Sequence, residues 1–238
     1  MFDARRLLDQ VIGALPAEVK NGGIADMARR GADALPGGGK GSGLATGALA
    51  GGVLGLIAGN KKARKFATKS AGTALKLGGL AAVAAVGYTA WQRHRGGDQQ
   101  GLMLPPPDSG FAPEQAPRGP EDLARGVLVA MIQGAKADGH IDAEEQSRIF
   151  GHIEALALDA EAKAFVMDEL AAPADIARVT AYAGSPETAT ELYAAAFMAM
   201  DPDTPAERAF LTRLQTGLSL DPDLAAHVEA AVQAELRD

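Results

Sequence analysis

The sequence predicts an all-α protein. No stretch of the 238 residues alternates apolar and polar side chains with the period of two that marks a strand. After residue 120, signals that start and end helices follow one another closely. We therefore expect a C-terminal bundle of about seven helices over residues 120–238, preceded by glycine-rich, membrane-associated helices and a proline-rich linker.

Residues 1–40 predict an amphipathic or partly ordered segment. Apolar residues recur there at helical spacing: Leu7, Leu8, Val11, Ile12 and Leu15. Asp9 interrupts this run, which is unlike the apolar centre of a signal peptide. Two interpretations stay open, a helix that faces a protein partner and a helix that lies on a membrane surface.

Residues 41–95 predict membrane-associated helices, first because glycine recurs at every fourth position. The register consists of Gly43, Gly47, Gly51, Gly55 and Gly59. Positions four apart share one helix face, and in a bilayer a face without side chains lets a second helix approach closely. The uncharged stretch between Lys40 and Lys61 is long enough to span a bilayer. We expect this glycine zipper to pack helices within the chain or between copies of it.

A second uncharged stretch, residues 77–92, lies between Lys76 and Arg93. It is shorter than a usual span, but flanking basic side chains can reach the interface. Tyr88 and Trp91 lie near one end, where an aromatic belt would place them. We expect a transmembrane helix here; the alternative is a hairpin of alanine- and glycine-rich helices outside the membrane.

Charge is divided unevenly along the chain, with +8 over residues 1–100 and −15 over residues 101–238. The basic half has few aromatic residues, so we expect lipid and not nucleic acid as its partner. Residues 61–76 carry six basic residues and no acid, which predicts a cytoplasmic location for them and a periplasmic one for everything after residue 91. Arg29, Arg30 and Lys40 favour the opposite orientation.

Residues 96–119 predict a disordered linker, because the stretch 96–120 has six prolines and few apolar residues. The seven helices then expected are 120–137, 142–156, 159–170, 173–184, 186–200, 204–217 and 221–232. Their start signals are Pro120, a capping box of Asp142 and Glu145, Asp159, Pro173, Ser185 with Pro186, a capping box of Thr204 and Glu207, and Asp221 with Pro222. Gly217 is expected to end the sixth helix.

Two acidic turns carry a resemblance to a known family. "AKADGHIDAEE" and, further on, "MDPDTPAERAFLTRLQTGLSL" resemble the TerB-like tellurite-resistance domain. Together with a glycine-rich, membrane-associated N-terminal region, they resemble the YebE family of bacterial inner-membrane proteins. The resemblance implies an all-helical domain at the bacterial inner membrane. It also implies a divalent-metal site, which falls on Asp138, Asp142, Glu145, Asp201, Asp203 and Glu207.

Helix capping explains several of these acidic residues without a metal. Asp142, Glu145 and Glu207 have capping duties, whereas Asp138 and Asp201, like Asp203, do not. Neither turn has the spacing of an EF-hand, and the four histidines show no metal-ligand or triad spacing. We find no enzyme signature and no cofactor motif. The expected function is a membrane-anchored, non-enzymatic interaction module of the bacterial envelope, connected with stress; the alternative is a tethered sensor or buffer of divalent metal.

Overall fold

The computed structural model describes residues 3–5, 7–8, 79–97, 101–137, 160–200 and 202–237. Within these ranges the protein is all-helical, as the sequence predicts. The helices are α7 (Gly79–His94), the short 3-10 helix η2 (Pro113–Gln115), α8 (Pro120–Ala135), α10 (Ala160–Ala171), α11 (Ile176–Thr180), α12 (Pro186–Met198), α13 (Pro205–Gly217) and α14 (Pro222–Arg237). The glycine register at 43–59 and the helix expected at 142–156 lie outside the described residues.

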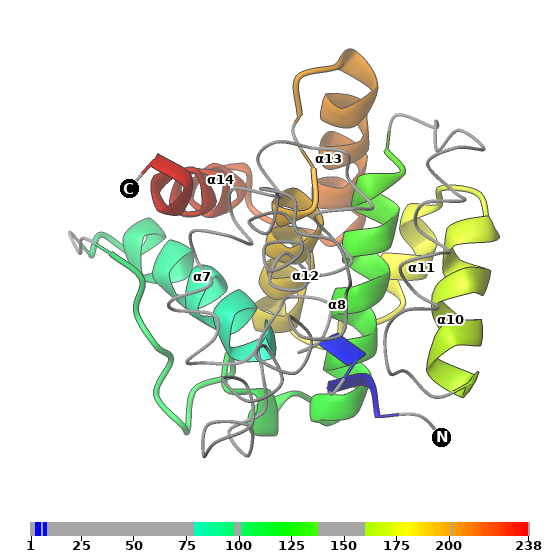
Figure 1. Ribbon diagram of the computed structural model, residues 1–238. Helices are drawn as coiled ribbons and strands as arrows, with labels where there is room; N and C mark the ends of the chain where they lie inside the picture. The colour runs from blue at the N-terminus through cyan, green and yellow to red at the C-terminus, as the bar shows by residue number, and fades with distance from the viewer. Residues whose placement is uncertain are drawn as a thin grey trace, which may run out of the picture.

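Helices α8 and α12 form the centre of the domain, and they pack on each other along much of their length (Figure 1). α7 and α14 cover one side of α12, and α10 and α11 cover the other side of α8. Close packing of α8 on α12 depends on Gly134. A Cβ atom added there would lie 2.6 Å from the backbone oxygen of Ala196, so only glycine fits without a shift of one helix.

Helix α7 coincides with the stretch expected to cross a membrane, and here it packs mainly against α14 and α12. Leu80, Val83 and Val86 are buried and belong to the core of the domain. Tyr88 and Trp91, expected at a membrane interface, both contact the ring of Phe111, with ring centroids 5.8 Å apart in each pair. None of the helices in the described ranges is both long and apolar enough to cross a membrane.

The segment that joins α7 to α8, residues 101–119, differs from the disordered linker expected over 96–119. The side chain of Phe111 is 2% exposed and lies against α7. The Met103 amide donates a hydrogen bond of 2.8 Å to the Thr89 hydroxyl of α7. This connecting segment is therefore packed against the domain, although its proline content is typical of a flexible tether.

Two residues of the expected N-terminal amphipathic helix also reach the core. Leu7 and Leu8 are both buried, at 1% and 0% exposed. Close to them, the Ala4 amide donates a 2.8 Å hydrogen bond to the Glu121 carboxylate in the first turn of α8. The described part of this segment thus contacts the chain's own helical domain.

Local capping signals predict the helix starts well. Ser185 caps α12 by accepting a hydrogen bond from the Thr188 amide, and Thr204 and Glu207 form the expected capping box of α13. Two predictions are wrong. The helix expected at 173–184 is shorter: α11 begins at Ile176, with Asp175 as its cap, and ends at Thr180.

The second wrong prediction concerns the end of α13. Gly217 is still helical, and the residue with positive φ after the helix is Ser219. The glycine serves close packing instead, because a Cβ atom there would lie 3.1 Å from the Thr180 side chain of α11.

Candidate functional site

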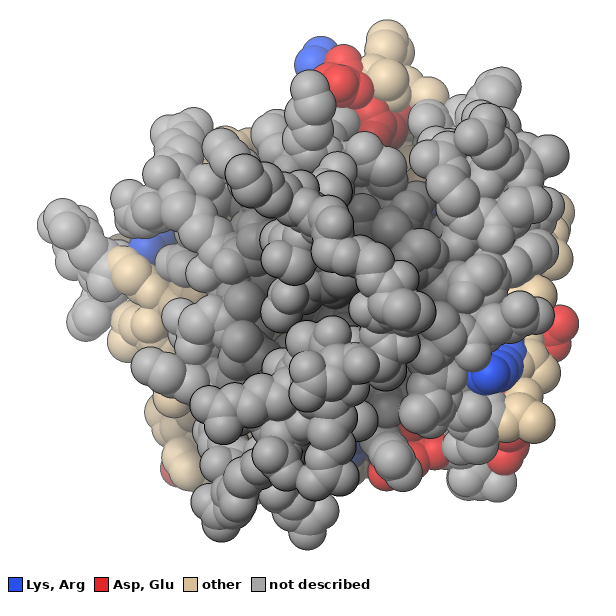
Figure 2. All heavy atoms as spheres, in the orientation of Figure 1, with Lys and Arg blue, Asp and Glu red and all other residues tan. Residues whose placement is uncertain are grey.

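Of the six acidic residues that the resemblance implies as metal ligands, the structure describes two. Asp203 is exposed at the start of α13, and Glu207 lies in the first turn of the same helix. The Glu207 carboxylate accepts hydrogen bonds of 3.0 Å and 2.8 Å from the Thr204 amide and hydroxyl, as a capping residue does. Figure 2 shows charged side chains exposed over this helix, at the top of the view. Asp138, Asp142, Glu145 and Asp201 lie outside the described residues.

No group of three or more histidine or carboxylate side chains that could hold a metal ion occurs in the part of the chain that the structure describes. One pair of histidines does meet, although they are far apart in the sequence. His94 in the last turn of α7 and His227 in α14 place their ring centroids 5.8 Å apart, in an edge-to-face arrangement. Sequence spacing could not reveal this pair, because the packing of α14 on α7 creates it.

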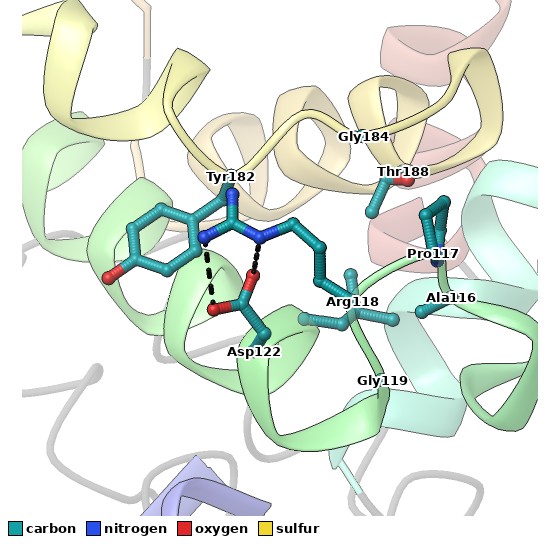
Figure 3. A pocket seen from close by; sticks show the side chains of 9 residues that line it. Ala116, Pro117, Arg118, Gly119, Asp122, Tyr182, Gly184 and Thr188 are labelled. Atoms are coloured by element: carbon teal, nitrogen blue, oxygen red, sulfur yellow. Dashed lines mark hydrogen bonds and ion pairs between the residues drawn. The ribbon is translucent and has the colours of Figure 1, made fainter.

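A small cavity lies where the connecting segment meets the turn between α11 and α12. Its volume of about 10 Å³ is at the lower limit for holding one water molecule. Arg118 dominates its wall (Figure 3): the guanidinium makes two contacts with Asp122, at 2.9 Å and 3.3 Å. It also donates a 2.6 Å hydrogen bond to the Ala181 carbonyl, and it lies 5.7 Å from the Tyr182 ring centroid. These contacts fasten the start of α8 to the α11–α12 turn.

Burial raises the pKa of the Tyr182 hydroxyl, and the charges of Asp122 and Glu169 add to this effect. The phenol therefore stays protonated at physiological pH. In this form it can donate a hydrogen bond but offers no charged group to a ligand.

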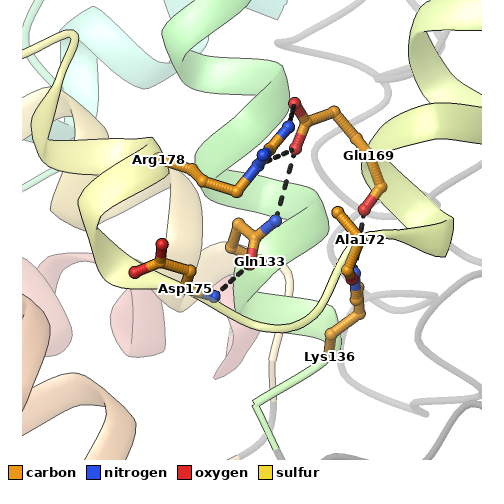
Figure 4. A network of polar contacts seen from close by, with 6 residues as sticks. All are labelled: Gln133, Lys136, Glu169, Ala172, Asp175 and Arg178. Atoms are coloured by element: carbon orange, nitrogen blue, oxygen red, sulfur yellow. Dashed lines mark hydrogen bonds and ion pairs between the residues drawn. The ribbon is translucent and has the colours of Figure 1, made fainter.

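A second polar cluster joins α8, α10 and α11 (Figure 4). The buried Glu169 carboxylate pairs with Arg178 and accepts a 3.3 Å hydrogen bond from the Gln133 amide. Gln133 in turn accepts a 2.9 Å hydrogen bond from the Asp175 amide at the start of α11. The cluster compensates the charge of Glu169 and connects the capping residue of α11 to α8.

Lys136 extends the same cluster to the C-terminal end of α10. Its ammonium donates to the carbonyls of Glu169 and Ala172 at the end of α10. A positive charge at the C-terminal end of a helix interacts favourably with the helix dipole. Burial lowers the pKa of this ammonium, while the charge of Glu169 opposes the shift and that of Arg178 adds to it. Lys136 thus acts as a buried C-terminal cap for α10.

The third notable group is Glu191, in the middle of α12. Its side chain is 1% exposed, and its Oε1 atom has no hydrogen-bond partner. It lies beneath the connecting segment: a Cβ atom at Gly87 of α7 would be 3.4 Å from Glu191 Cγ and 3.2 Å from Phe111 Cε1. Burial raises the pKa of the Glu191 carboxyl well above its ordinary value, and Glu187 one turn earlier adds to this. The Glu191 carboxyl therefore keeps its proton to a higher pH than an exposed glutamate does.

The sequence contains a signal for Glu191 that sequence analysis missed. It is the one charged residue in the run 188–200, which is otherwise small, apolar or aromatic. A helix without a polar face is buried all round, so a carboxyl group within it has to be buried too.

One family model matches the chain over residues 43–232, with the description "Protein of unknown function (DUF533)". No curated protein matches the chain significantly, and no solved structure does.

Proposed function

The chain belongs to the DUF533 family of proteins of unknown function, and we propose that it is a membrane-anchored, non-enzymatic interaction module of the bacterial inner membrane, connected with envelope stress. The finer relationship that we propose, a TerB-like domain of the YebE type, rests on the two acidic turns and the glycine-rich region described above.

The observation that carries this proposal is the extent of the family match. It begins at Gly43, the first glycine of the four-residue register, and continues into α14. The family unit thus combines the glycine-rich stretch with the helical domain. A groove of glycines is the feature by which helices pack closely in a bilayer, where apolar side chains alone give little drive to associate.

The packing of α7 changes which residues we propose as the anchor. Because α7 packs among α12 and α14, we assign the membrane span to residues 41–60 alone. With a single span there, the basic residues 61–76 keep the helical domain on the cytoplasmic face. The periplasmic location expected from the sequence required residues 77–92 to cross as well.

Extraction with alkaline carbonate tests the anchor. The full-length protein should stay with the membrane pellet, whereas a variant with Leu54→Lys and Ile57→Lys should move to the supernatant. The matched control places two lysines at exposed positions of the connecting segment, Leu104→Lys and Gln115→Lys, and should stay in the pellet. Release of the unmodified protein would disprove the anchor.

Crosslinking in native membranes tests the interaction role of the glycine face. Gly51→Leu and Gly55→Leu should abolish crosslinks between copies, because leucine fills the groove. Ala50→Leu, off the glycine register, should leave them unchanged. Topology is read separately: a cytoplasmic fluorescent reporter after Asp238 should be bright and a phosphatase reporter inactive, and the reverse result would return the domain to the periplasm.

The alternative, a tethered divalent-metal sensor, draws on one observation. Thr204 and Glu207 perform the capping of α13, so the exposed Asp203 carboxylate is not used as the cap. If the acidic turns bind Ca²⁺ or Mg²⁺, the unmodified protein should melt at a higher temperature with millimolar cation than with chelator. Asp203→Asn should reduce that difference, and equal melting in both buffers would leave these residues as surface charges.

A further inference from the structure

We propose that His94 and His227 form a binding site for a divalent transition metal, of the Zn²⁺ and Cu²⁺ class, which fastens α7 to α14. This site differs from the acidic turns in its residues, its place in the fold and the class of metal. It does not depend on the function proposed above.

The distance between the rings fits a shared ion. With Zn–N bonds of about 2.0–2.1 Å and an angle near tetrahedral, two imidazoles on one zinc ion have centroids roughly 5–6 Å apart. The observed separation is 5.8 Å, and the rings are inclined at 74°. Because His94 is exposed, its ring can turn about its side-chain bonds and direct a nitrogen at an ion held by His227.

A second, independent observation concerns the tautomer of His227. Its Nδ1 lies 2.6 Å from the carbonyl oxygen of Asp223, one turn earlier in α14. A carbonyl can only accept, so Nδ1 carries the proton of the neutral ring, and Nε2 keeps the lone pair that a metal requires. Metal-binding histidines typically donate their other ring N–H to a carbonyl or carboxylate in this way, which fixes the ring and makes it a better ligand.

Solvent can reach the histidine pair, and the two arginines near it interact with other groups. His94 is exposed and His227 partly so. The Arg95 guanidinium lies 4.6 Å from the Trp91 ring centroid, and Arg93 donates to the Gly101 carbonyl. Both arginines thus have partners other than the histidines.

Imidazole nitrogen favours zinc, copper and nickel over calcium and magnesium, which prefer oxygen. Two protein ligands leave coordination positions for water or for a ligand from another molecule. The site therefore selects the class of ion, and its open positions can be filled by a partner.

Thermal melting of the full-length chain, purified without a histidine tag, tests the site. A metal bound only by the folded state, at a hundredfold excess over Kd, raises the melting temperature of a protein of this size by about 5–10 °C. Zn²⁺ should give such a rise and Mg²⁺ should not. His94→Gln and His227→Gln should each remove it.

The chain supplies its own controls and a second measurement. His140→Gln and His152→Gln alter the other two histidines and should keep the response to Zn²⁺. Trp91, the single tryptophan, precedes His94 by less than one helical turn, so Cu²⁺ at the site should quench its fluorescence. That quenching should vanish in His227→Gln, although His227 is on another helix.

Loss of the Zn²⁺ response in the control variants, or its survival in either test variant, would overturn the proposal. So would identical melting with Zn²⁺ and Mg²⁺. Because both test residues are at the surface, these variants should fold, and an unchanged melting temperature without metal verifies that they do.

Discussion

Removing α7 should unfold the helical domain, and this prediction distinguishes a core helix from a separate membrane segment. The comparison is between a fragment of residues 79–238 and a fragment of residues 119–238, which lacks α7 together with the connecting segment packed on it and starts where the sequence suggested a domain boundary. Leu80, Val83 and Val86 are 4%, 0% and 0% exposed. At about 1.5–3 kcal/mol for each buried aliphatic side chain, their loss removes roughly 5–9 kcal/mol.

That amount is comparable to the whole stability of a typical domain, about 5–15 kcal/mol. The shorter fragment also exposes the faces of α12 and α14 that α7 covers. Circular dichroism during heating and binding of a hydrophobic dye measure the outcome. The longer fragment should melt cooperatively and bind little dye, whereas the shorter one should lack a sharp transition. A cooperative transition at the same temperature in both fragments would refute the role of α7 in the core.

Three further predictions concern stability. Gly134→Ala should destabilise the protein by about 1–3 kcal/mol in urea unfolding, because the added methyl group meets the backbone of α12; an unchanged midpoint would mean that α8 and α12 can move apart freely. Burial raises the pKa of Glu191 in the folded state, so the contribution of this group to stability should be most favourable below the ordinary value of 4.5 and should fall as pH rises towards the folded-state pKa. Glu191→Gln, neutral at every pH, should flatten this slope, and an identical slope would assign the effect to other groups. Thr204→Ala should cost about 1 kcal/mol by removing the α13 cap, Thr204→Ser should restore it, and equal midpoints for all three would contradict the cap.

The helix caps could be predicted from the sequence, because each depends on residues that are close together in the chain. The caps at Ser185 and Thr204 use side chains three residues from the amides they bind, so the chain shows both partners together. α11 was placed too early because Pro173 was interpreted as its start, although Asp175 is the local cap and its side chain accepts a hydrogen bond from the Ala177 amide. What neighbouring residues do not show is the contact with Gln133 of another helix, which accepts a hydrogen bond from the Asp175 amide.

The interpretation of α7 had a different obstacle. A helix that is apolar on every side suits both a membrane span and the centre of a protein, and periodicity does not distinguish them. The distinguishing feature is Gly87, which makes room for Phe111 and Glu191. Both contacts come from segments that the sequence placed elsewhere, in a linker and in a separate domain.

The site residues that sequence analysis missed are of the same non-local kind. His94 and His227 meet because α14 packs on α7, and Lys136 caps a helix other than its own. Glu191 could have been found, since a lone charge in a helix without a polar face implies a buried carboxyl group.

The position of α7 has a mechanical consequence. It is the first helix of the described range 79–97, and it lies in the core against α12 and α14. A pull on the chain ahead of Gly79 would load α7 along its axis and shear it against both neighbours. Force applied there would therefore reach the centre of the folded domain through the contacts of α7 with α12 and α14.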